Sequence, residues 1–190
     1  MDDSFFNLYA SCDDEKLRKS LLGLSSLQSF KKGDIILGMG ERQEWIYFLY
    51  SGIACAYSLE HDGTEVVDCI MDKKGMPVMP SACLNEPSPF FIEALSDCTL
   101  TRINLQQIEN LRQTHAGAAS LFNSFLSKAW LDHHELESAL RRLPARQRYE
   151  WFLTSYPNVI DAIPHSKIAS FLGMSPVTLS RIRNTHSNLR

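Results

Sequence analysis

The side chains best placed to do chemistry in this sequence lie near its C-terminal end, between His165 and Arg183. Apolar residues at helical spacing lead up to Gly173, whose tolerance of a left-handed backbone suits the end of a helix. Ser175 then offers an N-cap hydroxyl to a second helix, and Pro176 suits the first position of that helix. Two short helices joined by so tight a turn predict a helix-turn-helix, a motif that places its second helix in the major groove of double-stranded DNA.

The second predicted helix has one apolar side and one polar side. Leu179 and Ile182 face the first helix. Val177, Ser180 and Arg181 lie on the other side, at i, i+3 and i+4, on a face with the size and chemistry to read base edges. A plain three-helix subdomain would account for the glycine and the apolar residues, but not for a run that ends in Ser-Arg-Ile-Arg. DNA binding is therefore the preferred interpretation.

Charge is distributed unevenly along the chain. The formal net charge is −3, yet residues 141–190 contain eight Lys and Arg side chains and only two acidic ones. The first 140 residues are correspondingly acidic. Because phosphate contact depends on the local patch rather than on the total charge, this distribution fits a nucleic-acid partner for the C-terminal part.

Length and composition restrict the class of protein. A chain of 190 residues, 44% of them hydrophobic, holds one large domain or two small ones. Its acidic start is unlike a signal peptide and no apolar run could span a membrane, so we expect a cytoplasmic protein without a membrane partner. The five cysteines are widely spaced and form no Cys-x-x-Cys pair, which favours buried free thiols over a metal site or disulfides.

The middle of the chain is rich in short β-type runs separated by turn signals. The predicted strands are 45–50, 53–59, 65–71, 90–95 and 99–103. So many short strands predict an antiparallel barrel or jelly roll. Helices are predicted at 13–22 with Ser11 as N-cap, from Asn104 as N-cap, at 116–143 and at 145–155.

The long predicted helix carries apolar residues on more than one face. Residues that recur at alternating spacings of three and four positions form one stripe along this helix, which we call the seam. The seam extends over about three heptads, and its residues are apolar except for Asp132. Further apolar residues lie off the seam, so one face can pack on the barrel and another on a second copy of the chain. We therefore predict a homodimer whose interface is the seam, formed by Phe122, Phe125, Ala129, Leu136 and Leu143.

Motifs in both halves of the chain match one family. In the barrel they are Lys32-Gly33-Asp34-Ile35-Ile36, Gly40-Glu41, Asp62-Gly63-Thr64-Glu65 and residues 93–98, and in the C-terminal part they are residues 168–175 and 179–183. This order of motifs resembles the cyclic-AMP receptor protein/fumarate-nitrate regulator (CRP/FNR) superfamily of bacterial transcription factors, and residues 148–153 are similar to a Bacteroidetes-type subgroup. The resemblance implies an α+β fold in three parts: a cyclic-nucleotide-binding-like β-barrel or jelly-roll sensor domain (1–114), a long dimerisation helix (115–143) and a helix-turn-helix domain (144–190).

The resemblance also implies roles for individual residues. Val177, Ser180 and Arg181 occupy base-reading positions, and Arg181 matches an arginine that pairs with guanine. Pro176 and Val177 replace an Arg-Glu pair of the family, so the target differs from that of the cyclic-AMP receptor. The expected phosphate contacts are Ser166, Lys167, Thr178 and Arg183. RNA polymerase is a further candidate partner of such a regulator.

The family's effector site is degenerate in this sequence. Cyclic-nucleotide binders carry Gly-Glu for the ribose and Arg-Ser/Thr for the cyclic phosphate, where this chain has Met79-Pro80 and Ser88-Pro89. Residues 75–101 contain no Lys, Arg or His, so a buried phosphodiester would lack a paired cation. We expect no cyclic nucleotide at this degenerate pocket, formed by Gly75, Met79, Pro80, Ser88 and Pro89, and the effector stays unknown.

Other functions have less support. The chain has no nucleophile elbow, P-loop, dinucleotide fingerprint or His-Glu-x-x-His motif, so we predict no enzyme. His133 and Glu137 have metal-ligand spacing, but a solvated helix face is preferred, and no metal or cofactor is predicted. Cys12 alone disfavours an iron–sulfur sensor, whereas haem stays open because any of the six histidines could be an axial ligand. The rival interpretation is a ligand-binding or protein-interaction module without DNA function.

Overall fold

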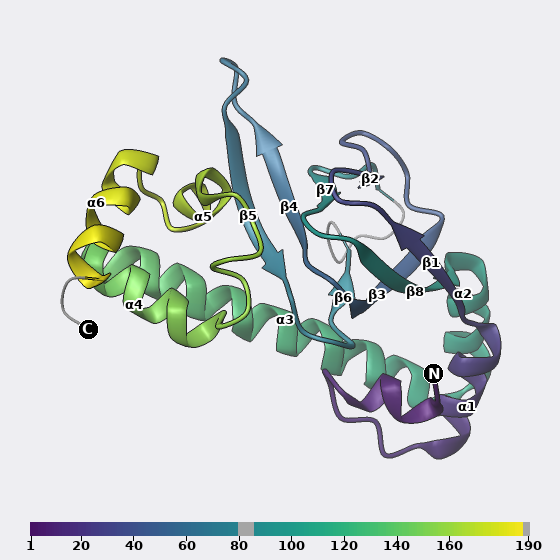
Figure 1. The fold of residues 1–190 in the computed structure, drawn as a ribbon. Helices are drawn as coiled ribbons and strands as arrows, with labels where there is room; N and C mark the ends of the chain where they lie inside the picture. Colours follow the sequence, from purple (N-terminus) through teal and green to yellow (C-terminus); the bar gives the residue numbers. More distant parts are fainter. Residues whose placement is uncertain (80–85, 188–190) are drawn as a thin grey trace.

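The computed structural model describes residues 1–79 and 86–187, and this part of the chain forms helices at both ends of a β-rich region (Figure 1). The first helices are η1 (Asp3–Asn7) and α1 (Glu15–Leu24). The strands are β1 (Ser26–Phe30), β2 (Ile35–Leu37), β3 (Trp45–Ser51), β4 (Ala54–Leu59), β5 (Glu65–Met71), β6 (Pro77–Val78), β7 (Phe91–Ala94) and β8 (Cys98–Asn104). The later helices are α2 (Leu105–Thr114), α3 (Ala116–Arg142), α4 (Ala145–Ser155), α5 (His165–Phe171) and α6 (Pro176–Ser187).

The strands form two antiparallel sheets, in the orders β1-β8-β3-β6 and β2-β7-β4-β5. Strand β8 pairs with both β1 and β3, and its buried residues are Cys98, Leu100, Thr101 and Ile103. Buried residues of both sheets, such as Leu49, Leu100 and Ile92, share one apolar cluster. The predicted fold class, α+β with an antiparallel jelly roll, is therefore confirmed.

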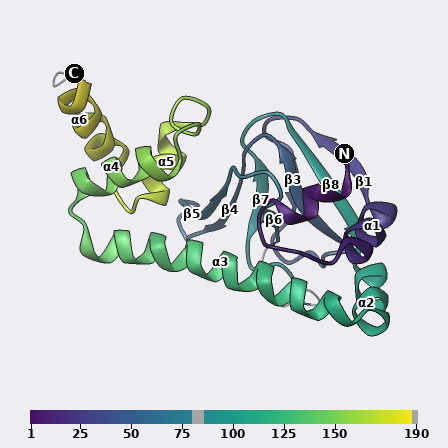
Figure 2. The same ribbon diagram turned by 90° about the horizontal axis from the view of Figure 1, so that it is seen from below.

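The long helix α3 runs from α2 at one end of the molecule to α4 at the other (Figure 2). Its bounds agree with the predicted 116–143 to within a residue. Pro144 follows it because proline cannot continue a helix, and α4 begins at the next residue. Neither α3 nor any other described helix has both the length and the apolarity to cross a membrane.

The C-terminal helices share a hydrophobic core with the barrel. Residues of β4 and β5 pack with residues of α4, α5 and α6 in a single cluster of buried side chains. Its members include Tyr57, Val67, Ile70, Phe152, Ile168, Phe171 and Leu179. The helix-turn-helix is therefore seated on the barrel in this structure, and the predicted division of the chain at residues 114 and 143 stays a prediction.

Some elements differ from the sequence predictions. The first helix begins at Glu15, and the N-cap is Asp14, whose carboxylate accepts from the N–H of Leu17 at 3.0 Å; the expected cap, Ser11, is wrong. Strands β1, β2 and β6 were not expected. They lack the signal that a sequence can carry, because β1 is mostly exposed and the other two have only three and two residues.

Candidate nucleic-acid interface

The turn between α5 and α6 is set by its glycine. Gly173 has a φ of +60°, a left-handed conformation that residues with a Cβ rarely adopt. The N–H of Met174 donates to the carbonyl of Ala169 at 3.0 Å, which closes the end of α5. The hydroxyl of Ser175 accepts from the N–H of Thr178 at 3.1 Å and caps α6. The glycine turn and the serine cap predicted from the sequence are both present.

One side of helix α6 packs against the apolar core, and the other side is exposed to solvent. Leu179 is 1% exposed, and Ile182 packs against the same apolar cluster. Val177 is 60% exposed, and Ser180 and Arg181 are exposed beside it. The structure thus brings the three expected base-reading residues together on one open face. That they contact bases stays a prediction.

Arg148 of α4 has a structural role that the sequence did not reveal. Its guanidinium donates to the carbonyl of Leu140 on α3 at 3.2 Å and to the carbonyl of Gly173 at 3.4 Å. Arg146, two residues earlier, pairs with Glu150 on the surface of the same helix. Both arginines belong to the basic C-terminal segment, so part of the positive charge of that segment interacts with groups of the same chain.

Three of the four expected phosphate contacts remain accessible to a ligand. Ser166 is exposed at the first turn of α5, and Arg183 is half-buried beside the imidazole of His165. The hydroxyl of Thr178 lies 2.9 Å from that of Ser175, at the first turn of α6. These positions surround the open face of α6, and their contact with phosphate stays a prediction.

Lys167, the fourth expected phosphate contact, is placed differently by the structure. The residue is buried, and its ammonium group pairs with Glu65 and Glu93 of the barrel. In this arrangement it cannot reach a phosphate, because the barrel covers it. Sequence spacing could not reveal this, since both partners lie more than seventy residues away in the chain.

The face of α3 expected at a dimer interface is largely used within one chain. Phe125 is 5% exposed and packs on Phe48 and Tyr9, and Leu136 is 5% exposed. Asp132, the polar exception in that seam, accepts from the hydroxyl of Tyr9 at 2.7 Å. These residues are therefore core residues of the protomer. Of the rest of the seam, Phe122, Ala129 and Leu143 are half-buried.

The opposite face of α3 carries the apolar residues that the chain leaves uncovered. Trp130 is 65% exposed and stacks on His134, and Leu131 is 51% exposed. Both border a shallow surface depression together with Leu126 and Ser127. The sequence showed these residues as apolar but off the seam, and only the position of the barrel identifies them as the open side.

The residues of the degenerate effector pocket serve the barrel itself. The hydroxyl of Ser88 accepts from the N–H of Phe90 at 3.2 Å, and its carbonyl accepts from the N–H of Gly40 at 2.8 Å. Gly75 is buried under the N-terminal segment, where a Cβ would lie 3.0 Å from that of Leu8. Met79 is half-buried and Pro89 is exposed, while Pro80 lies outside the described residues.

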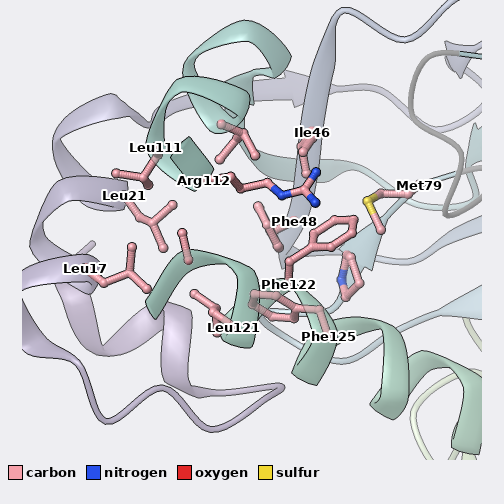
Figure 3. A pocket seen from close by; sticks show the side chains of 13 residues that line it. Leu17, Leu21, Ile46, Phe48, Met79, Leu111, Arg112, Leu121, Phe122 and Phe125 are labelled. Atoms are coloured by element: carbon pink, nitrogen blue, oxygen red, sulfur yellow. The ribbon is translucent and has the colours of Figure 1, made fainter. Parts of the chain in front are cut away.

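Two of the cavities beside α3 lie between this helix and the barrel. The one in Figure 3 is lined by apolar side chains of α1, α3 and β3 and by Arg112, and at about 40 Å³ it is too small for an effector. The other, of about 430 Å³, lies between α3 and strands β5 and β6. Its lining is mainly apolar, and the polar residues in it include Asp68, Asp132 and His133. No Lys or Arg is among the described residues that line it, and the nearby Lys73 and Lys128 are both paired with Asp132. Burial raises the pKa of Asp68, which favours the neutral form of that carboxyl group.

Thiols and metal-type ligands do not gather at a site in the described part of the chain. The four cysteines that it contains are free, and burial raises the pKa of Cys55 and of Cys69 to about 12. The prediction of free thiols is confirmed for these residues. Among the described residues no group of three or more His, Cys, Asp or Glu side chains is arranged to hold a metal ion.

Residues 27–115 match the family described as cyclic nucleotide-binding domain. The chain's fold is similar to that of several solved structures. FixK2 from Bradyrhizobium japonicum has a TM-score of 0.73 at 19% identity, covering 86% of this chain and 85% of that one. The c-di-GMP-responsive global regulator CLP of Xanthomonas campestris has a TM-score of 0.71 at 19% identity and 92% coverage of both chains. A putative CRP/FNR transcriptional regulator from Eubacterium rectale has a TM-score of 0.67 at 19% identity, covering 92% of this chain and 83% of that one.

A curated relative is a much longer protein. The potassium channel KOR2 of Oryza sativa subsp. japonica is 26% identical over 149 residues, which are 77% of this chain and 21% of the channel. The chain thus spans about one fifth of the length of that relative.

Proposed function

We propose that this chain, which contains a cyclic nucleotide-binding-type domain and has the fold of CRP/FNR regulators, is a DNA-binding transcription regulator that acts as a homodimer. The observation that carries the proposal is the open face of α6 with Val177, Ser180 and Arg181. None of these side chains has a polar partner among the described residues. A rigid helix that presents free polar and cationic side chains suits the major groove.

The side chains on this surface are suited to two kinds of DNA contact, with bases and with phosphates. Arg181 is free to donate two hydrogen bonds to O6 and N7 of a guanine, while Val177 offers an apolar contact to a thymine methyl group. Ser166, Thr178 and Arg183 flank this face and would bind phosphates, which position the helix without reading sequence.

The homodimer is proposed to form through the outward face of α3, around Trp130 and Leu131. Exposed apolar side chains of this size on one helix face mark an interaction surface, and a second copy can cover them with the same face. A two-fold axis along α3 would present two α6 helices to one side of a DNA duplex. A pseudo-palindromic target with half-sites about 34 Å apart then follows.

The barrel is proposed to act as a scaffold or sensor for something other than a cyclic nucleotide. Ser88, at the position of the phosphate-binding arginine, is occupied by backbone hydrogen bonds, and the larger cavity has a mainly apolar lining without a described Lys or Arg. The two lysines nearby, Lys73 and Lys128, are already paired with Asp132, so a phosphodiester would find no unpaired Lys or Arg among the residues described at either place. RNA polymerase remains the further partner expected of such a regulator.

The test is a titration of fluorescent random-sequence duplex at low salt, read by anisotropy. The wild-type protein should bind, and the double variant Arg181→Ala/Arg183→Ala should bind more weakly, chiefly through the loss of the phosphate contact made by Arg183. Lys19→Ala/Lys16→Ala is the matched control, because it removes the same charge from exposed positions on α1, at the far end of the molecule. No binding by any variant, or equal loss in both double variants, would instead favour a module without DNA function.

A further inference from the structure

Lys167, on the first helix of the helix-turn-helix, is held by the barrel. Its Nζ lies 2.8 Å from Oε2 of Glu65 on β5 and 2.8 Å from Oε2 of Glu93 on β7, and it sits over the ring of Tyr57. The side chain of Lys167 is 9% exposed. Burial by itself lowers the pKa of Lys167, but the hydrogen bonds to Glu65 and Glu93 outweigh it and leave this pKa raised. The ammonium group is therefore charged, and its charge is already matched.

A second contact joins the same helix to the edge of a sheet. Strand β5 is the outermost strand of the order β2-β7-β4-β5, so one side of its backbone has no strand partner. The hydroxyl of Ser170 accepts from the N–H of Val67 and donates to the carbonyl of Glu65, both at 2.9 Å. Ser170 of α5 thus provides hydrogen-bond partners for one N–H and one carbonyl of this open edge, and the N–H of Val67 is protected only while α5 is docked.

This docking changes the charge that the helix-turn-helix presents. Strand β5 lies beside α5, whereas the tip of the β4–β5 hairpin, which carries the exposed Glu60 and Asp62, projects beyond that helix (Figure 1). Phosphates that approach the first turn of α5 would meet the carboxylates of Glu65 and Glu93 around Lys167. They would not meet the charge of Lys167, which the barrel has neutralised. The docked state is therefore a weaker partner for DNA than the helix-turn-helix alone would be.

We infer that Lys167, Glu65 and Glu93 form a latch that holds the helix-turn-helix on the barrel and weakens DNA binding until it opens. The inference rests on the proposed DNA-binding function. When α5 leaves β5, Lys167 at the first turn of the helix becomes available to a phosphate, and the carboxylates of Glu65 and Glu93 no longer lie against the helix. Barrel and DNA thus compete for the same ammonium group, so any ligand that disturbs β5 or β7 would change DNA affinity.

Competition of this kind has a quantitative consequence. If only the open state binds DNA tightly, the apparent affinity scales with the fraction of molecules that are open. Exchange of the Val67 amide with solvent scales with the same fraction, because that amide is covered by Ser170 in the closed state. A variant that opens the latch should therefore raise both quantities by the same factor.

The test compares Glu65→Lys with Glu60→Lys in the full-length protein. Both variants change the charge of the same hairpin by the same amount, but Glu60 lies outside the latch and is exposed. Glu65 is 43% exposed in its side chain, so the lysine fits sterically while it repels Lys167. Hydrogen–deuterium exchange of the Val67 amide is measured without DNA, and the affinity for a random duplex is measured by anisotropy.

We expect Glu65→Lys to raise amide exchange at Val67 at least tenfold and duplex affinity by a similar factor, each relative to Glu60→Lys. Unchanged exchange at Val67 would overturn the latch. Faster exchange with equal duplex affinity for the two variants would overturn the competition with DNA. If amide exchange is faster but neither the wild type nor either variant binds the duplex, the result would contradict the proposed DNA-binding function and the competition with DNA. It would still support the docking contact between α5 and the barrel.

Discussion

The guanidinium of Arg148 on α4 lies 3.4 Å from the carbonyl oxygen of Gly173, the residue at which the helix-turn-helix changes direction. A second nitrogen of the same group donates to the carbonyl of Leu140 on α3 at 3.2 Å. One side chain therefore ties the long helix, α4 and the turn together.

Arg148→Ala should lower the free energy of unfolding by about 2 kcal/mol, because it removes charge-assisted hydrogen bonds from two carbonyls, of which that of Leu140 is part-buried. Arg146→Ala is the matched control, since that exposed arginine pairs only with Glu150 on the helix surface, and its loss should cost under about 0.5 kcal/mol. Urea denaturation at one fixed protein concentration measures both. Equal destabilisation by the two variants would contradict this role of Arg148.

Gly173→Ala should destabilise the protein by about 1–2 kcal/mol, because alanine resists a φ of +60°. Space is not the obstacle, since the nearest atom to an added Cβ would be 3.5 Å away. Gly23→Ala, in the exposed part of α1, should instead stabilise by about 0.5–1 kcal/mol. Thermal unfolding of both variants separates a backbone requirement from a general effect of adding a methyl group, and a neutral Gly173→Ala would contradict the argument.

The turn could be predicted from the sequence because its physics is local. A glycine at the helix end, a serine cap and a proline at the first position act within a few residues of one another, and each is found in its expected role. Lys167 shows the opposite case. Its partners come from strands about a hundred and about seventy residues earlier, and no local pattern distinguishes a lysine that faces DNA from one that faces the barrel.

The long helix shows a second limit of prediction from the sequence. Its heptad-like spacing correctly predicts an extended helix with apolar faces, but this periodicity does not reveal whether each face packs against the rest of the same chain or against another molecule. The structure covers the regular seam around Phe125 and Leu136 with the chain's own residues and leaves Trp130 and Leu131 open. The strands missed by the sequence are the short or polar ones, which depend on their neighbours in the sheet rather than on their own composition.

Trp130→Asp should convert the proposed homodimer to a monomer without loss of folding, because the new charge would face a desolvated interface. Phe125→Asp should unfold the protomer instead, because that side chain is 5% exposed and packs on Phe48 and Tyr9. Sedimentation velocity at micromolar concentration, with circular dichroism as the folding control, distinguishes the two. A wild-type monomer, or a dimeric Trp130→Asp variant, would contradict the assignment of this face.

Cyclic AMP and cyclic GMP should bind more weakly than about 1 mM, a binding free energy of only about −4 kcal/mol. The reason is that Ser88 carries no charge, and the mainly apolar cavity next to α3 has no described Lys or Arg in its lining, while Lys73 and Lys128 nearby are already paired with Asp132. Isothermal titration calorimetry with each nucleotide is the measurement. Micromolar affinity for either would show that other residues supply the charge.

The central claim is that the open face of α6 reads DNA sequence, and selection from a random duplex library followed by affinity measurements tests it most directly. We predict enrichment of a pseudo-palindromic site and a cost for Arg181→Ala of about 1–3 kcal/mol per half-site on that site, with little change on a scrambled duplex. Arg183→Ala should weaken binding to both duplexes alike and lower the salt slope by about one. Failure to enrich any site, or equal weakening of both duplexes by Arg181→Ala, would contradict the claim that this face specifies sequence.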